Sequence, residues 1–278
     1  MNDRVAIRRI LVALDASHQS LAALNAAVLL AEALEAELLG MFVEDVNLVR
    51  WAALPFAREV GHATARARPL AGEDLARALR GQAARAQQAL ARLATGRGVT
   101  WSFRVGRGEV AATLLAAAHD TDLVALGATF LSWAAGRRLG STARAVIGAG
   151  ARPALLLPAG TRWAPPYVVV YDGSAAARRA LSIAEHLVAS IQDPRLVIVL
   201  VGKADSETIR RELTERLTRG GASAEFRSVA RHDPAELVRA LRATSPGSLI
   251  LPVGAPLLTD SAATDRLAAL RCAILIVP

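Results

Sequence analysis

The chain has 278 residues, a formal net charge of +8 and one cysteine. Its length exceeds the usual size of one domain and favours two domains of roughly 100–150 residues each. A single cysteine excludes an intrachain disulfide framework, and no uncharged apolar run is long enough to span a membrane. The amino-terminal segment has no signal-peptide pattern. We therefore expect a cytoplasmic protein without a membrane partner.

The basic charge does not predict a nucleic-acid partner. Lys203 is the only lysine, and the arginines of residues 73–93 and 207–217 alternate with glutamate and alanine, as on solvated helix faces. Aromatic and basic residues do not interleave in the way that base stacking requires. We expect no binding to nucleic acid.

The first elements predict a strand, a turn, a helix and a second strand. Residues 8–15 (RRILVALD) form an apolar run that Asp15 closes, and Ser17 can cap the helix that follows. Residues 21–43 carry three glutamates, so they predict a helix and a strand rather than a membrane span.

Residues 106–111 (GRGEVA) have the spacing of a dinucleotide-binding fingerprint. They follow the third predicted strand rather than the first, however, and no acidic residue ends a strand about 20 residues further on, where a ribose contact belongs. We interpret this segment as a turn that requires glycine conformations.

The segment 127–142 (GATFLSWAAGRRLGST) is the strongest candidate for a ligand site. It follows the apolar run 122–127 and precedes a predicted helix and a buried strand. Gly140 and Ser141 open that helix, so backbone N–H groups, hydroxyls and the positive end of the helix dipole would meet there. No lysine follows Gly140, which excludes a Walker A loop. The sequence predicts an anion site of another kind.

The chain repeats its own pattern after a linker at residues 160–166 (GTRWAPP). VVVYDGS (168–174) corresponds to LVALDAS near the start, and AILIVP (273–278) corresponds to ALLLP (154–158). Strands and helices alternate through five strands in each half, which predicts an α/β protein with two open, doubly wound parallel sheets. We expect domains at 1–160 and 164–278, related by a pseudo-twofold axis and associated through these two final strands.

The halves differ in two places. Asp15 and Gly127 are 112 positions apart, whereas Asp172 and Gly254 are only 82 apart, and the surplus lies within residues 46–80. Trp51 and Phe56 of this insertion would form a flap over the site or, as we favour, a domain-packing surface. In addition, 26 positions separate Gly127 from Pro153, but only 18 separate Gly254 from Cys272. The second half keeps a helix that Thr259 or Ser261 can cap, but it has lost eight residues of the predicted phosphate loop.

Other chemistry is sparse. The histidines have no metal-ligand spacing, and no catalytic triad can be assembled from sequence order, so we predict neither a metal site made of side chains nor a catalytic set. Cys272 lies in an apolar segment and is expected to be a buried, inert thiol. The histidines are His18, His62, His119, His186 and His232.

These motifs resemble the universal stress protein family across nearly the whole chain, as a tandem two-domain member. The resemblance rests on Asp-x-Ser after the first strand of both halves, on FVED (42–45), and on VALGATF, GRRLGST and RPALLLP between residues 124 and 158. It implies five parallel strands in the order 3-2-1-4-5 in each half. It also implies a role in the stress response and pairing of domains through their last strands, within the chain or in a homodimer.

The resemblance further implies an adenine-nucleotide site for ATP or AMP in the first half, with Mg²⁺ bound to the nucleotide. Asp15 would hold a ribose hydroxyl or this divalent ion, Val43 would pair with the adenine, and the glycine loop would take the phosphates. The implied contacts are Asp15, Val43, Leu126, Gly127, Gly140, Ser141 and Thr142.

One position departs from the family pattern G-x2-G-x9-G-[ST]: Phe130 stands where the middle glycine belongs. Arg137 and Arg138 could compensate by reaching phosphate oxygens. The alternative is an interaction module that binds no nucleotide and acts through an unknown protein partner. No residue is positioned as a base for water, so we expect slow ATP hydrolysis at most.

Overall fold

The computed structural model describes residues 7–52, 54, 58–60, 67–69, 72–133, 136–189, 195–230, 233–258 and 262–278. The first half contains β1 (Arg9–Ala13), α1 (His18–Leu34), β2 (Glu37–Asp45), α2 (Val46–Ala52), β3 (Arg58–Val60), β4 (Ala67–Pro69), α3 (Gly72–Thr95), β5 (Trp101–Gly108), α4 (Val110–Ala118), β6 (Leu123–Ala128), β7 (Phe130–Trp133), β8 (Gly136–Leu139), α5 (Ser141–Ala149) and β9 (Ala154–Pro158). The second half contains β10 (Tyr167–Tyr171), α6 (Ala175–Ala189), β11 (Leu196–Val201), the 3₁₀ turn η1 (Gly202–Ala204), α7 (Glu207–Arg219), β12 (Ala224–Val229), α8 (Pro234–Thr244), β13 (Ser248–Pro252), the 3₁₀ turn η2 (Pro256–Leu258), α9 (Ala263–Leu270) and β14 (Ala273–Val277).

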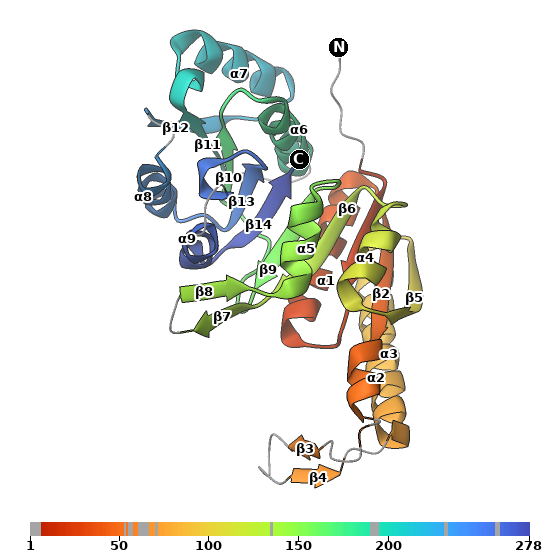
Figure 1. Cartoon of the computed structure of the whole chain (residues 1–278). Coiled ribbons are helices and arrows are strands. Elements are labelled where there is room, and N and C mark those ends of the chain that lie inside the picture. Colours follow the sequence, from red (N-terminus) through yellow and green to blue (C-terminus); the bar gives the residue numbers. More distant parts are fainter. Residues whose placement is uncertain are drawn as a thin grey trace.

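The main strands form one ten-stranded sheet in the order β12-β11-β10-β13-β14-β9-β6-β1-β2-β5 (Figure 1). The strands are parallel within each half, and numbered within a half they lie in the order 3-2-1-4-5 in both. The predicted α/β class and the repeated arrangement are confirmed. The expectation of two sheets needs a correction, because β9 and β14 pair antiparallel and join the halves into a single mixed sheet. Each of these strands would otherwise leave a row of unpaired backbone groups.

The pairing at this seam is self-complementary. Leu155 pairs with Leu275, and Leu156 pairs with Ile274. In the sequence repeat Leu155 corresponds to Ile274, and Leu156 corresponds to Leu275. Leu155 therefore pairs with the equivalent of Leu156, and Leu156 pairs with the equivalent of Leu155. This is the pattern of an isologous interface, and it supports the pseudo-twofold relation between the halves. The predicted contact through the two final strands is therefore present.

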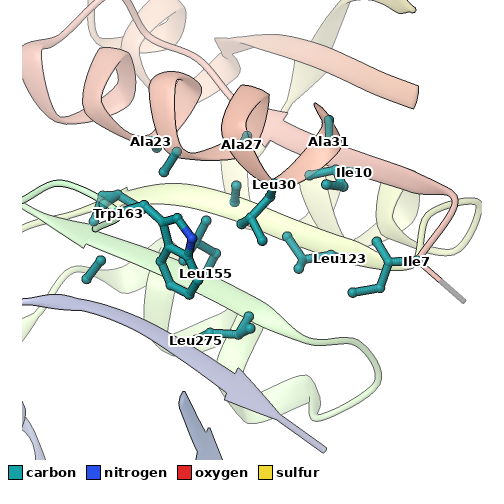
Figure 2. Close-up of a cluster of buried hydrophobic side chains, with 14 of the residues drawn as sticks. Ile7, Ile10, Ala23, Ala27, Leu30, Ala31, Leu123, Leu155, Trp163 and Leu275 are labelled. Atoms are coloured by element: carbon teal, nitrogen blue, oxygen red, sulfur yellow. The ribbon is translucent and has the colours of Figure 1, made fainter. Parts of the chain in front are cut away.

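Two layers of helices cover the sheet. One core lies under α1, α3, α6 and α7, and the other lies under α4, α5, α8 and α9; both cores contain residues of both halves. Figure 2 shows part of the first core, where Ala23 and Ala27 of α1 face the sheet. Leu155 of β9 and Leu275 of β14 lie in the same cluster. Small residues on α1 let the helix lie close to the sheet. Because α1 and α6 also contact each other, this layer is continuous across the seam.

The linker between the halves is packed rather than extended into solvent. Trp163 is only 5% exposed, joins the first core (Figure 2), and has its ring 5.6 Å from that of Tyr167. The Ser248 hydroxyl accepts from the Ala164 N–H and donates to the Ala164 carbonyl, both at 2.9 Å. A Cβ on Gly247 would lie 2.4 Å from the carbonyl oxygen of Ala164, so the chain approaches too closely here for any side chain.

The insertion after β2 forms α2 and leads through the short antiparallel pair β3–β4 into α3. Helix α2 contacts α3, β2 and β5. Trp51 on α2 is 66% exposed, so it does not contribute to a packing surface. Phe56 lies outside the described residues. The pair β3–β4 was not predicted, because three-residue strands are too short to show a pattern.

The interpretation of residues 106–111 as a glycine turn is wrong. Strand β5 continues through Gly108, and neither glycine of this segment has a positive φ. Side-chain ends lie close to both glycines. A Cβ on Gly106 would lie 2.7 Å from Met41 Cε, and one on Gly108 would lie 2.5 Å from the Thr113 hydroxyl. Both atoms belong to side chains that can rotate, so the crowding favours glycine at these positions without requiring it.

Candidate functional site

A cavity of about 340 Å³ opens at the carboxyl ends of β1, β2 and β6. Strand β1 lies between the other two, so this is the point where the chain reverses its direction of strand addition, the usual ligand position in open α/β sheets. All the contact residues expected from the sequence line this one cavity. Its lining consists of Ala13, Leu14, Asp15, Ser17, Gln19, Ser20, Met41, Val43, Val110, Leu114, Leu126, Gly127, Thr129, Gly140, Ser141, Thr142 and Ala143.

Asp15 is held in a tight turn at the start of α1. Its Oδ1 accepts the N–H of Ser17 at 2.8 Å, and the Ser17 hydroxyl accepts the N–H of Ser20 at 3.1 Å, so Ser17 is the helix N-cap. Ala16 has the left-handed φ of 60° that this turn requires. The carboxylate is exposed at the cavity. Asp15 therefore shapes the turn and presents negative charge to a ligand.

The same turn occurs in the second half. Asp172 Oδ1 accepts the N–H of Ser174 at 2.9 Å, the Ser174 hydroxyl accepts the N–H of Ala177 at 3.1 Å, and Gly173 has a φ of 79°. A structural role is thus sufficient to explain the aspartate in either half. Any ligand-binding role of Asp15 must come from what surrounds it.

Gly127 is required by packing at the end of β6. A Cβ there would lie 2.7 Å from both the carbonyl carbon and the Cβ of Gln19, and 2.9 Å from the backbone nitrogen of Ser20. The first turn of α1 could not approach β6 so closely over any other residue. The glycine therefore brings α1 against one wall of the cavity, whether or not a ligand binds.

Gly140 stands directly before the first residue of α5. Its N–H donates to the Thr129 carbonyl at 3.0 Å, and its φ of −54° is accessible to any residue. It is the N-cap of α5 but has no side chain to cap the helix, so the N–H groups of the first turn, from Ser141 to Ala143, have no capping side chain. These amides, the hydroxyls of Ser141 and Thr142 and the helix dipole make the start of α5 suited to an anion.

The other wall is apolar. Met41 and Val43 project from β2, Val110 and Leu114 come from α4, and Leu126 comes from β6. Sequence reasoning missed Met41, although it lies two residues from Val43 and so on the same side of the strand. Nothing in the sequence singled out Val110 or Leu114, which become part of the site only when α4 packs beside β2. The cavity thus combines an apolar wall with a polar end at the start of α5.

The segment between Thr129 and Gly140 is an antiparallel strand pair, β7–β8, rather than the loop expected from the sequence. Phe130 pairs with Leu139 in this ladder, so an extended backbone suffices there and no glycine conformation is needed. The side chains of Phe130, Arg137 and Arg138 lie outside the described residues. That the arginines compensate for Phe130 by reaching phosphate oxygens stays a prediction.

In the second half, η2 lies between α8 and α9, the counterparts of the helices beside the first cavity. Ala255 and Leu257 are completely buried there. Between β13 and α9, η2 is therefore packed into the core of the second half. Thr259 and Ser261 lie outside the described residues, and the N-cap of α9 is Ala262.

Within the described part of the chain, no group of three or more metal-ligating side chains comes together, and no helix is long and apolar enough to cross a membrane. His62 and His232, for which we also predicted no metal binding, lie outside the described residues. Cys272 is 1% exposed, and burial raises the pKa of its thiol to about 12. A thiol of that pKa stays protonated at neutral pH, in agreement with the expected inert role.

Comparison with solved structures places the fold. A universal stress protein from Archaeoglobus fulgidus DSM 4304 is 16% identical, with a TM-score of 0.68 over 96% of this chain and 97% of that one. A functionally unknown protein from Pseudomonas aeruginosa PAO1 is 15% identical, with a TM-score of 0.58 over 99% and 94%. A universal stress protein solved in complex with cAMP is 22% identical, with a TM-score of 0.39 over 55% and 97%. The bound cAMP is a property of that protein.

No curated protein sequence matches the chain. The family model of the universal stress proteins matches residues 6–158, which include the Asp15 turn, the cavity and the start of α5. This match spans more than half of the chain and agrees with the fold and with the motifs of the sequence. The chain belongs to the universal stress protein family.

Proposed function

We propose that the first half binds an adenine nucleotide, ATP or AMP, as part of a cytoplasmic role in the stress response. One observation carries this proposal: every contact residue expected from the sequence lines a single cavity with an apolar wall and an uncapped helix start. The apolar wall at Val43 suits a planar base, and the start of α5 suits phosphates. We propose the halves as domains 1–160 and 164–278, of which only the first holds ligand.

Magnesium fits this site only together with the nucleotide. The described residues at the polar end supply one carboxylate, Asp15, and the hydroxyls of Ser17, Ser141 and Thr142. Mg²⁺ is commonly held by one or two carboxylates together with substrate phosphates. Asp15 Oδ1 already accepts the N–H of Ser17, so Asp15 would contribute a single oxygen to an ion that arrives with the phosphates.

The repeat provides a matched control for the test. Asp15→Ala and Asp172→Ala each remove the carboxylate of the same turn, so both should lower stability to a similar extent. Only Asp15→Ala should weaken ATP and AMP binding, by tenfold or more, about 1.4 kcal/mol. Calorimetric titration measures the affinities, and chromatography of denatured, freshly purified protein identifies any nucleotide carried from the cell. Equal effects of the two substitutions on affinity would refute the proposal, as would the absence of nucleotide binding.

The alternative, an interaction module with a protein partner, is favoured by one feature. Leu48 and Trp51 of α2 and Leu54 just after it are exposed large apolar residues close together in the chain, as at many protein contact sites. If this is the functional surface, the wild-type chain should bind neither ATP nor AMP, and Trp51→Ala should abolish capture of the protein partner. Capture that persists in Trp51→Ala would remove the support for this alternative.

A further inference from the structure

Strands β7 and β8 form an arm that leaves the first half and reaches the second. The arm begins after Thr129, turns back, and ends at Gly140, with Phe130 paired to Leu139 at its base. Strand β8 lies against α9, on the other side of the β9–β14 seam (Figure 1). A segment of the first half is thus supported by a helix of the second.

Both ends of the arm belong to the cavity. Thr129 and Gly140 line it, and they are joined by the hydrogen bond from the Gly140 N–H to the Thr129 carbonyl at 3.0 Å. Gly140 is also the N-cap of α5, and its carbonyl accepts the N–H of Arg144 at 3.1 Å. Gly140 therefore links the base of the arm to the start of α5, whose amides form the polar end of the cavity.

A buried cluster connects the arm to α9. Leu139, the last residue of β8, is 5% exposed and belongs to the same core as Leu267 and Leu270 of α9, which are 3% and 8% exposed. Ala143 and Val146 of α5 belong to this core too. Apolar packing across the seam can therefore hold the arm and the first turn of α5 together.

Among the described residues of the second half, no strand pair stands in the position symmetric to the arm. The second half is eight residues shorter at this point and has η2 instead, packed within its own half against α8 and α9. Because of this asymmetry, the second half can support the cavity of the first half without binding a ligand itself. We propose that α9 is a positioning element for the cavity of the first half, acting through the arm, so that ligand binding and docking of the arm on α9 are coupled. This inference rests on the proposed nucleotide site.

The coupling is tested first without any ligand, by amide hydrogen exchange on the full chain. Leu267→Ala on α9 should loosen the arm and raise the exchange rate of the Gly140 amide at least tenfold. Leu213→Ala on α7 is the matched control: Leu213 is also 3% exposed and also in the second half, but it belongs to the opposite core. It should leave the exchange of Gly140 unchanged. Equal exchange of Gly140 in both variants would overturn the proposal.

The second test uses ATP. Leu267→Ala should weaken ATP binding at least fivefold, and Leu213→Ala should leave it within twofold of the wild type. By reciprocity, ATP added to the wild type should slow exchange in α9 and in residues 139–143 but not in α7. This measurement needs no substitution, so it decides the question even if a variant fails to fold. ATP binding that leaves α9 unprotected would refute the coupling.

The two proposals can fail separately. If the wild type binds no ATP but Gly140 exchange still responds to Leu267→Ala and not to Leu213→Ala, the nucleotide site is wrong and the positioning role of α9 stands. If ATP binds with the same affinity in all three proteins, the site stands and α9 has no positioning role.

Discussion

Single residues of the repeat show how the same turn is made by different means. Ala16 and Gly173 occupy equivalent positions after the first strand of each half, with φ of 60° and 79°. The left-handed conformation costs an alanine roughly 1–2 kcal/mol and costs glycine almost nothing. The Asp-x-Ser pattern predicted the turn, but not that one half makes it with strain.

Ala16→Gly should therefore stabilise the protein. Relief of the strained φ is partly offset by the greater backbone entropy of glycine in the unfolded chain, so we expect a net gain of about 0.5–1 kcal/mol. Gly173→Ala should have the opposite effect. Urea unfolding of the two variants measures both free energies, and a loss of stability in Ala16→Gly would show that the turn needs the alanine side chain.

The candidate site was more predictable in its residues than in their roles. Asp15, Gly127 and Gly140 could be placed together because the carboxyl ends of β1 and β6 meet at one edge of the sheet. Their local roles could not be read from spacing. Gly127 is explained by the approach of α1, and the Gly140 amide is bonded within the protein, contacts that form only after packing.

At the scale of elements, the buried strands and amphipathic helices were predictable, since continuous apolar runs such as β11 have few other structural uses. The arm β7–β8 and the pair β3–β4 were not, because each strand has four residues or fewer and pairs outside the main sheet. The linker was identified by its composition, but the burial of Trp163 was not foreseen.

Gly247, before β13, provides a prediction about the linker. Its Cβ would lie 2.4 Å from the carbonyl oxygens of both Ala164 and Pro165, atoms of the backbone that cannot rotate away. Gly247→Ala should destabilise the protein by about 2–3 kcal/mol, as overpacking does. Gly254→Ala is the control, because a Cβ there meets nothing within 4 Å. Thermal unfolding compares them, and equal midpoints would show that the linker yields at little cost.

The start of α7 provides a prediction about pH. Arg210 donates to Asp205 at 2.6 Å, and this hydrogen bond lowers the pKa of the Asp205 carboxyl below its usual range. A lowered pKa stabilises the fold above the carboxyl's unfolded pKa, and this contribution is lost as pH falls through the folded value. Asp205→Asn should cost about 1 kcal/mol at pH 7, and the difference from wild type should shrink toward zero near pH 2. Urea unfolding at several pH values measures the difference in stability between the two proteins. If this difference is the same at every pH, the ionised Asp205 carboxylate is not its cause.

For the whole molecule, the seam restricts which surfaces two copies of the chain could use to associate. The edges of β9 and β14, which could pair with a second copy, are already paired with each other. Any homodimer of the full chain must therefore use another surface. The duplication in the sequence predicted which strands would meet, but not that their backbones would form one continuous sheet, because that depends on how the edges align in space.

The self-complementary register leads to a last prediction, on the isolated first half. Residues 1–160 end with β9 unpaired, and Leu155 and Leu156 pair across the seam with the equivalents of each other. A second copy of β9 can supply the same antiparallel partner, so this half should form a symmetric dimer. Light scattering after gel filtration should give twice the monomer mass, with circular dichroism as the check on folding.

Replacing Leu156 by proline removes a backbone donor at the seam, so the folded variant should be monomeric. A wild-type half that is folded and monomeric would mean that other contacts, such as those between α1 and α6, hold the halves of the full chain together.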